Sequence, residues 1–151
     1  MTAKDMFSHR VSILTGHYGT GKTEVSVNLA LALAAEGEQV MLADLDIVNP
    51  YFRSRERRPL LEKAGVRVIS SSQACSDADV RGILDIGGDP VGARVLARFQ
   101  PKIVQEDYQL IFVLNANRPE VRDAESAAAY LRSIEAVTGL TCSGLVNNTH
   151  L

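Results

Sequence analysis

One stretch near the N-terminus constrains this chain more than any other, because it follows the pattern G-x-x-x-x-G-K-[ST]. The stretch, which we name the phosphate loop, consists of Gly16, His17, Tyr18, Gly19, Thr20, Gly21, Lys22 and Thr23. Glycines at this spacing let the backbone turn tightly, so that successive N–H groups can point at phosphate oxygens. The final lysine and hydroxyl residue suit the β/γ-phosphates and Mg²⁺, respectively. The pattern therefore predicts a nucleotide-binding site.

The residues around the phosphate loop supply the structural context that this pattern requires. Residues 11–14 are apolar with β-branched members and predict a strand, whereas residues 24–36 are rich in Ala and Leu and end at Gly37, which predicts a helix and its C-cap. A glycine-rich turn that binds nothing is the alternative, and this strand–loop–helix context disfavours it. A Rossmann dinucleotide site is also disfavoured, because the glycines do not form G-x-G-x-x-G.

Composition bounds the class of protein. The 151 residues are 46% hydrophobic and 23% charged, which suits one domain with a real core. The net charge of -2 gives no indication of nucleic acid or an anionic membrane as a bulk partner. The longest apolar stretch, residues 29–35, is far too short for a membrane span. Cys75 and Cys142 lie far apart without a C-x-x-C pair, so we expect neither structural zinc nor a cysteine-held iron–sulfur cluster, and we expect a cytoplasmic protein.

Apolar strand patterns alternate with helical patterns along the whole chain. The alternation predicts an α/β fold with three layers, in which helices flank a mainly parallel sheet. The later strands are predicted at residues 39–43, 66–69, 82–86, 110–114 and 145–148. The later helices are predicted at residues 90–105, disturbed by Pro101, and from an Asp123 N-cap to Thr138, while Pro59 splits or opens a helix in residues 51–64.

Acidic residues follow two of the predicted strands. Asp44 and Asp46 end the strand at residues 39–43, where ligands of such sheets bind, although acids there can also simply cap a turn. Asp85 follows an apolar run, as the acid that orients Mg²⁺ does in nucleotide hydrolases. Asp85-x-x-Gly88 also matches a switch pattern in which the glycine N–H binds the γ-phosphate. These acids predict a metal site beside the phosphate loop.

Two regions of the sequence are shorter than the predicted fold requires. Residues 70–81 barely reach the length of a parallel crossover and lack a helical apolar stripe. We therefore expect that native residues are absent near 79–81. The last strand is followed by no helix before Leu151, which leaves apolar sheet unprotected, so we expect either a covering partner subunit or missing C-terminal residues.

The phosphate loop, the Asp44-Leu45-Asp46 turn and the Asp85 switch pattern together resemble the MinD/ParA-like (CobQ/CobB/MinD/ParA) group of P-loop nucleotide-binding proteins. The resemblance runs over residues 11–148, and residues 46–52 and 87–94 look like a little-characterised bacterial and archaeal subgroup. It implies ATP and Mg²⁺ as ligands.

The resemblance also implies a role for each matching residue. Lys22 and the loop amides would hold the phosphates, and Thr23 would bind Mg²⁺ directly. Asp85 would hold Mg²⁺ through water, while Asp46 would lie at the metal and orient the attacking water. Asn147 would face the adenine base, although an asparagine that only forms a turn is the alternative.

The chain departs from this group at His17. The group often carries a lysine there, which reaches across a nucleotide-sandwich dimer, whereas a histidine is mostly uncharged at pH 7. Arg53 is the candidate to replace that lysine. A homodimer and a different protein partner therefore both remain open.

Three functions fit these observations. The first is an ATPase whose hydrolysis drives a conformational switch, which the phosphate loop, Asp46 and the Asp85 pattern favour. The second is a sensor that binds nucleotide without hydrolysing it, which His17 favours. The third is an ATP-dependent ligase or kinase, for which no substrate motif is visible. ATP rather than GTP follows from the resemblance alone.

Overall fold

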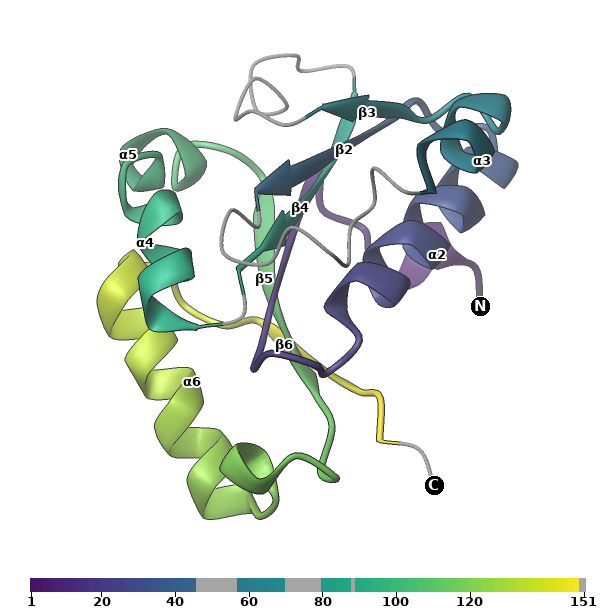
Figure 1. The fold of residues 1–151 in the computed structure, drawn as a ribbon. Helices are drawn as coiled ribbons and strands as arrows, with labels where there is room; N and C mark the ends of the chain where they lie inside the picture. Colours follow the sequence, from purple (N-terminus) through teal and green to yellow (C-terminus); the bar gives the residue numbers. More distant parts are fainter. Residues whose placement is uncertain (46–56, 70–79, 88, 150–151) are drawn as a thin grey trace.

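A parallel sheet of six strands forms the centre of the computed structural model, which describes residues 1–45, 57–69, 80–87 and 89–149. The strand order is β3-β2-β4-β1-β5-β6, and every neighbouring pair is parallel (Figure 1). The strands are β1 (Val11–Thr15), β2 (Val40–Leu45), β3 (Arg67–Ile69), β4 (Arg81–Ile86), β5 (Tyr108–Leu114) and β6 (Gly144–Asn147). The predicted α/β fold with a parallel sheet is confirmed.

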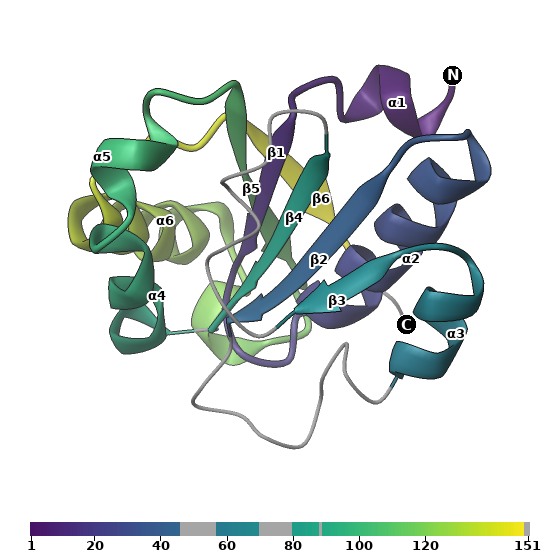
Figure 2. The same cartoon turned by 90° about the horizontal axis from the view of Figure 1, so that it is seen from above.

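Helices cover both faces of this sheet, as Figure 2 shows from above. On one face lie α2 (Lys22–Ala35) and α3 (Arg58–Lys63), with the short α1 (Ala3–Met6) beside α2. On the other face lie α4 (Pro90–Ala97), α5 (Gln100–Ile103) and α6 (Ala124–Thr138), preceded by the 3₁₀ turn η3 (Pro119–Val121). This arrangement gives the three layers that the sequence predicts.

Prolines set the boundaries that periodicity left open. The predicted helix at 90–105 is in fact two helices, because α4 ends at Ala97 and Pro101 lies in the first turn of α5. A proline fits the first turn of a helix, where its missing N–H leaves no hydrogen bond unmade. Pro59 likewise lies in the first turn of α3, so it opens that helix. The predicted Asp123 cap of α6 is confirmed, since the Asp123 carboxylate accepts the Ser126 N–H at 2.8 Å.

Alternating side chains of the strands build a separate apolar layer on each face. Leu14 and Leu42 pack with Val27 and Leu33 of α2 on one face. Ile13, Leu84, Leu110 and other residues pack against α4, α5 and α6 on the opposite face. Because a slip of one residue would exchange the two faces, this burial fixes the register of the central strands.

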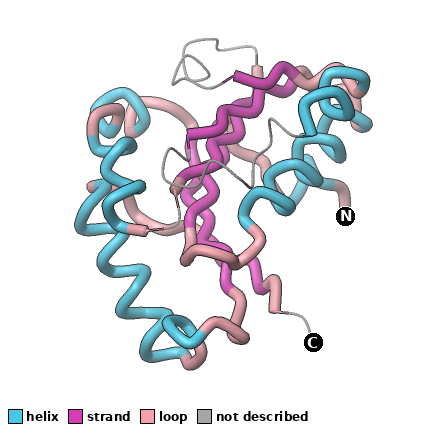
Figure 3. Tube along the Cα trace, viewed as in Figure 1, coloured by secondary structure: helices cyan, strands magenta, loops and turns pink. Residues whose placement is uncertain are grey.

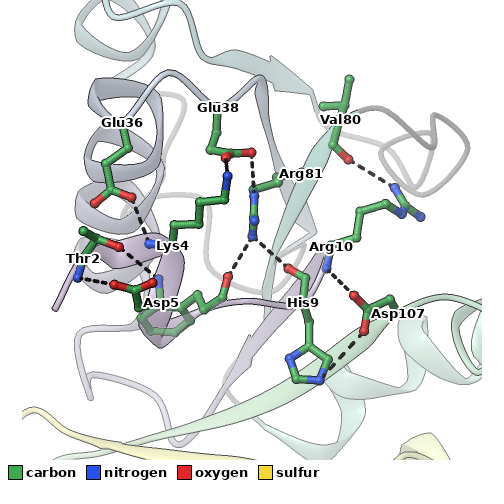
Figure 4. A network of polar contacts seen from close by, with 11 residues as sticks. Thr2, Lys4, Asp5, His9, Arg10, Glu36, Glu38, Val80, Arg81 and Asp107 are labelled. Carbon is green, nitrogen blue, oxygen red and sulfur yellow. Dashed lines mark hydrogen bonds and ion pairs between the residues drawn. The ribbon is translucent and has the colours of Figure 1, made fainter.

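The amino ends of the strands are tied by a polar network (Figure 4). The Arg81 guanidinium donates to the carbonyl oxygens of Phe7 at 2.8 Å and His9 at 3.2 Å, and it bonds Glu38 at 2.8 Å. Glu38 also pairs with Lys4 at 2.6 Å, and these hydrogen bonds lower the pKa of its carboxyl group. The network lies at the end of the sheet opposite to the phosphate loop.

The last strand is less covered than the central ones. Leu145 of β6 is 65% exposed, whereas Phe112, its neighbour on β5, is 1% exposed.

Among the described residues, no helix combines the length and apolar character that crossing a bilayer requires.

Candidate nucleotide site at the phosphate loop

The phosphate loop joins the end of β1 to the start of α2, and Figure 3 shows it beside the turns that follow β5 and β6. Its three glycines all have positive φ angles, namely 146° at Gly16, 77° at Gly19 and 89° at Gly21. Only glycine adopts such a backbone at low cost. A Cβ atom at Gly16 would also lie 2.3 Å from the carbonyl oxygen of Val113 on β5. The glycine spacing therefore serves a real tight turn.

The N-terminus of α2 follows the loop directly. Lys22 is the first residue of α2 and is 6% exposed, and Gly21 precedes it as the N-cap residue. The first N–H groups of a helix lack partners within the helix, and the helix dipole favours negative charge at this end. A loop of this kind that leads into a helix of 14 residues is an arrangement that binds phosphate.

The predicted hydroxyl and acid of the metal site lie in contact. The Thr23 hydroxyl donates to Oδ2 of Asp85 at 2.8 Å, although the two residues are 62 positions apart in sequence. Asp85 is 1% exposed, so this carboxylate is held inside the protein beside the first turn of α2. The fold thus joins the end of the phosphate loop to the acid of β4, as the sequence predicts.

A second acid lies next to this pair. Asp44 on β2 is in direct register with Asp85 on β4 and is 5% exposed. Residues in register on parallel strands point to the same face, which here is the α2 face because Leu14 of β1 is also in register with Asp85. The sequence placed Asp44 near the phosphates but assigned it no role.

These oxygen donors fit Mg²⁺. A hydroxyl and two neighbouring carboxylates are hard ligands, and Mg²⁺ is usually held by one or two carboxylates together with substrate phosphates and water. Within the described part of the chain, no three His, Cys, Asp or Glu side chains gather closely enough to hold a metal by themselves. A magnesium ion held by the described residues would therefore also need Thr23 and the phosphates of the nucleotide.

Some predicted site residues lie outside the described residues. Asp46, Gly88 and Arg53 fall in this group. Their roles at the attacking water, at the γ-phosphate and in place of the family lysine stay predictions.

Of two adjacent asparagines at the end of β6, the second contacts the phosphate loop. The Asn148 amide donates to the Thr20 carbonyl oxygen at 2.9 Å. Asn147, which the sequence proposed for the base, is exposed, and its Oδ1 accepts the Thr149 N–H at 3.0 Å in a local turn. Sequence alone gives no signal that separates the two, because either can face the loop.

His17 turns toward α6. Its ring packs edge-on against Tyr130 of α6 with ring centroids 5.1 Å apart, and its Nε2 lies 3.9 Å from the Glu120 carboxylate. Burial raises the pKa of Tyr130 to about 12, and the carboxylates of Asp89 and Glu120 act in the same direction. The position where the family lysine is expected is thus packed against the chain's own helix.

Arg118 also contacts the phosphate loop, and the sequence analysis missed it. Its Nε donates to the carbonyl oxygen of Gly19 at 3.0 Å from the turn after β5. An arginine in a turn carries no periodic signal, so only the fold brings it to the loop.

Comparison with known proteins agrees with this geometry. Residues 6–55 match the ParA family, described as NUBPL iron-transfer P-loop NTPase. The iron-sulfur cluster carrier protein of Escherichia coli is 50% identical over 40 residues, which are 26% of this chain and 11% of that protein. Antiactivator FleN of Pseudomonas aeruginosa is 57% identical over 37 residues, which are 24% of this chain and 13% of FleN. The matched segment thus spans little more than a tenth of these relatives. It confirms the MinD/ParA-like resemblance at the phosphate loop.

Solved structures share the fold at low identity. The cell division protein FtsY of Thermotoga maritima has a TM-score of 0.64 and 22% identity, over 91% of this chain and 51% of FtsY. A nucleotide-binding protein of Archaeoglobus fulgidus in complex with ADP has a TM-score of 0.55 and 18% identity, over 96% of this chain and 68% of that one. FtsY of Elizabethkingia anophelis in complex with GDP has a TM-score of 0.58 and 19% identity, over 91% of this chain and 48% of FtsY. Both adenine and guanine nucleotides therefore occur with this fold.

Proposed function

We propose that this MinD/ParA-like chain binds ATP with Mg²⁺ and hydrolyses it as a cytoplasmic switch that acts on a protein partner or on a second copy. The observation that carries the proposal is the bond between Thr23 and Asp85 beside Lys22, because it unites the three predicted phosphate and metal residues at one strand end.

The residues divide the work as follows. The amides of the phosphate loop and the Lys22 ammonium hold the phosphate oxygens, and the N-terminus of α2 adds its dipole. Thr23 would hold Mg²⁺ directly and Asp85 would hold it through water, with Asp46 as the proposed further residue at the metal. The ion would neutralise the charge of the phosphates. Asp46 orients the water for in-line attack on the γ-phosphate. Charge stabilisation and positioning carry such reactions, so no covalent intermediate is needed.

ATP is proposed over GTP because of the family resemblance. The Archaeoglobus fulgidus neighbour in complex with ADP supports this choice, whereas the FtsY neighbour in complex with GDP shows that the fold does not decide it.

The names of the relatives add an iron–sulfur role that we do not carry over. The matched residues 6–55 contain no cysteine, and the two cysteines of the sequence, Cys75 and Cys142, form no C-x-x-C pair. The similarity at residues 6–55 therefore supports nucleotide binding, in keeping with the P-loop NTPase description of the matched family.

A sensor that binds nucleotide without hydrolysing it is the second candidate. It is favoured by the packing of His17 against Tyr130 and near Glu120, because a side chain held there is directed to α6 and η3 of its own chain. Binding without turnover would select this candidate.

Phosphate release from Mg·ATP and Mg·GTP tests the proposal. We expect turnover in the wild type that Lys22→Ala lowers by at least about tenfold, because a charged contact to the phosphates is lost. Lys102→Ala, which changes an exposed lysine of α5, is the matched control and should retain turnover. Asp46→Asn should bind nucleotide but lose turnover. If the protein shows no Mg²⁺-dependent turnover, either at low concentration or at a high concentration that favours a second copy, the ATPase proposal is excluded and the non-hydrolysing sensor remains.

A further inference from the structure

We propose that Arg118 is a positioning residue for the phosphates. It stabilises the phosphate loop through its hydrogen bond to the Gly19 carbonyl oxygen, and it places a fixed positive charge beside the loop. The inference rests on the proposed nucleotide binding and adds to it a residue outside the G-x-x-x-x-G-K-[ST] pattern.

The contact between Arg118 and Gly19 is close. The Arg118 Nε donates to the Gly19 carbonyl oxygen at 3.0 Å. A Cβ atom at Gly19 would lie 2.6 Å from both Cζ and Nη2 of Arg118. The guanidinium thus occupies the space that any side chain at position 19 would need. Gly19 is required for its φ of 77°, and a side chain there would displace the flexible end of Arg118 from the loop.

The turn that carries Arg118 is itself ordered by hydrogen bonds. Asn115, which is 3% exposed at the end of β5, accepts the Asn117 N–H with its side-chain oxygen at 3.0 Å. Its main-chain oxygen accepts the Arg118 N–H at 3.1 Å. Pro119 then begins η3 with a restricted φ. The backbone at Arg118 is therefore already ordered. Forming the hydrogen bond to the loop costs little additional conformational entropy in this turn.

Two carbonyl oxygens of the loop are held in this way. Arg118 binds the Gly19 oxygen, and Asn148 binds that of Thr20 at 2.9 Å. In a trans peptide the carbonyl and the following N–H point in opposite directions. Holding the Thr20 oxygen toward β6 therefore directs the Gly21 N–H to the other side of the loop. The Thr20 N–H also donates to the His17 carbonyl oxygen at 3.2 Å and so closes a turn within the loop. The hydrogen bond from Arg118 therefore holds a turn that is itself hydrogen-bonded.

Arg118 also brings a positive charge to the phosphate loop. A guanidinium stays protonated at all physiological pH values, and its planar fork keeps further N–H groups beside the one that binds Gly19. Polyphosphate carries several negative charges, so a permanent cation against the loop favours its binding. Arg118 thereby supplies a fixed charge at the loop, whereas His17 is packed against α6.

Equilibrium titration with fluorescent ATP and GTP analogues, and competition by inorganic triphosphate, tests this role. Arg118→Gln removes the charge and the hydrogen bond, and we expect the dissociation constant of the nucleotide to rise about tenfold. This is the lower end of the free energy that a charged hydrogen bond contributes. Inorganic triphosphate should lose affinity by the same factor, since the effect is on the phosphates and not on the base. Arg118→Lys, which keeps the charge, should recover at least half of the loss in free energy.

Arg122→Gln is the matched control, because Arg122 is exposed on the same segment just after η3 and the change in net charge is identical. The proposal holds if Arg122→Gln binds as the wild type does and the thermal midpoints of all variants agree. It is overturned if Arg118→Gln binds nucleotide within twofold of the wild type, or if Arg122→Gln weakens binding equally. A wild type that binds neither nucleotide would instead remove the proposed function, and this inference with it.

Discussion

Gly16 is the glycine of the phosphate loop at which a side chain would meet the main chain of a neighbouring strand. A Cβ at this position would lie 2.3 Å from the main-chain oxygen of Val113, which cannot move without disturbing β5. We predict that Gly16→Ala lowers the free energy of unfolding by about 3 kcal/mol, from backbone strain together with overpacking. Chemical denaturation of the nucleotide-free protein measures this loss.

Gly37 provides the control for that substitution. It also has a positive φ, of 88°, but a Cβ there would meet no atom within 4 Å. Gly37→Ala should therefore cost only the backbone term of about 1 kcal/mol. Equal losses for the two variants would show that contact with β5 does not matter.

Tyr130 gives a prediction about alkaline pH. Its pKa is raised from 10.0 to about 12, so the folded state favours the protonated phenol. The resulting stability is present below pH 10 and is lost as the pH rises to 12, because the unfolded chain ionises first. Spectrophotometric titration should show a highest step that Tyr130→Phe removes and Tyr18→Phe leaves in place. A highest step that survives Tyr130→Phe would contradict the assignment.

At single positions, the contact between Thr23 and Asp85 could be anticipated, because the sequence patterns place both residues at the predicted metal site. Their roles toward phosphate and Mg²⁺, and that of Lys22, stay predictions. The contacts of Asn148 and Arg118 could not be anticipated, because they arise only when β5 and β6 bring distant turns to the loop. An asparagine or arginine in a turn has too many alternative roles to be assigned from sequence.

Among the elements, β4 links two opposite ends of the sheet. Asp85 near its carboxyl end meets the phosphate loop, whereas Arg81 at its amino end joins Glu38 and two carbonyl oxygens. We predict that Arg81→Met lowers the free energy of unfolding by about 2 kcal/mol, since three acceptors lose a charged donor. Nucleotide affinity should stay within twofold of the wild type, because the change lies at the far end of the strand.

Arg67→Met serves as the matched variant, since Arg67 is exposed at the start of β3. Denaturation should leave its stability within about 0.5 kcal/mol of the wild type. An equal loss in both variants would assign the effect to net charge, and a loss of nucleotide affinity in Arg81→Met would show that the two ends of β4 are coupled.

Element type was predictable, and element boundaries less so. Asp123 and Gly139 marked both ends of α6, because a side-chain cap and a left-handed glycine have local causes. The division of the helix at 90–105 into α4 and α5 was only partly visible, since a proline can disturb a helix or begin a new one. The short α1 was missed, as its four residues show no periodicity.

For the whole molecule, the parallel class of the sheet followed from alternation, but the strand order did not. The sheet places β4 between β1 and β2, so β1 and β2 follow one another in sequence but are not neighbours. The alternation of strands and helices does not specify which strands the crossovers bring side by side. The nearness of Asp44 to Asp85 depends on this order, because it makes β2 and β4 partners.

We propose above all that the phosphate loop and the adjacent Thr23–Asp85 pair form one binding site for a nucleotide with Mg²⁺. Isothermal titration of the whole chain with ATP and with GTP, in the presence of Mg²⁺ and of a chelator, tests it most directly. We predict saturable binding at one site. The dissociation constant should rise at least about tenfold when Mg²⁺ is removed, and equally in the variant Asp85→Asn. Failure of both nucleotides to bind at millimolar concentration, or equal binding with and without Mg²⁺, would contradict the account.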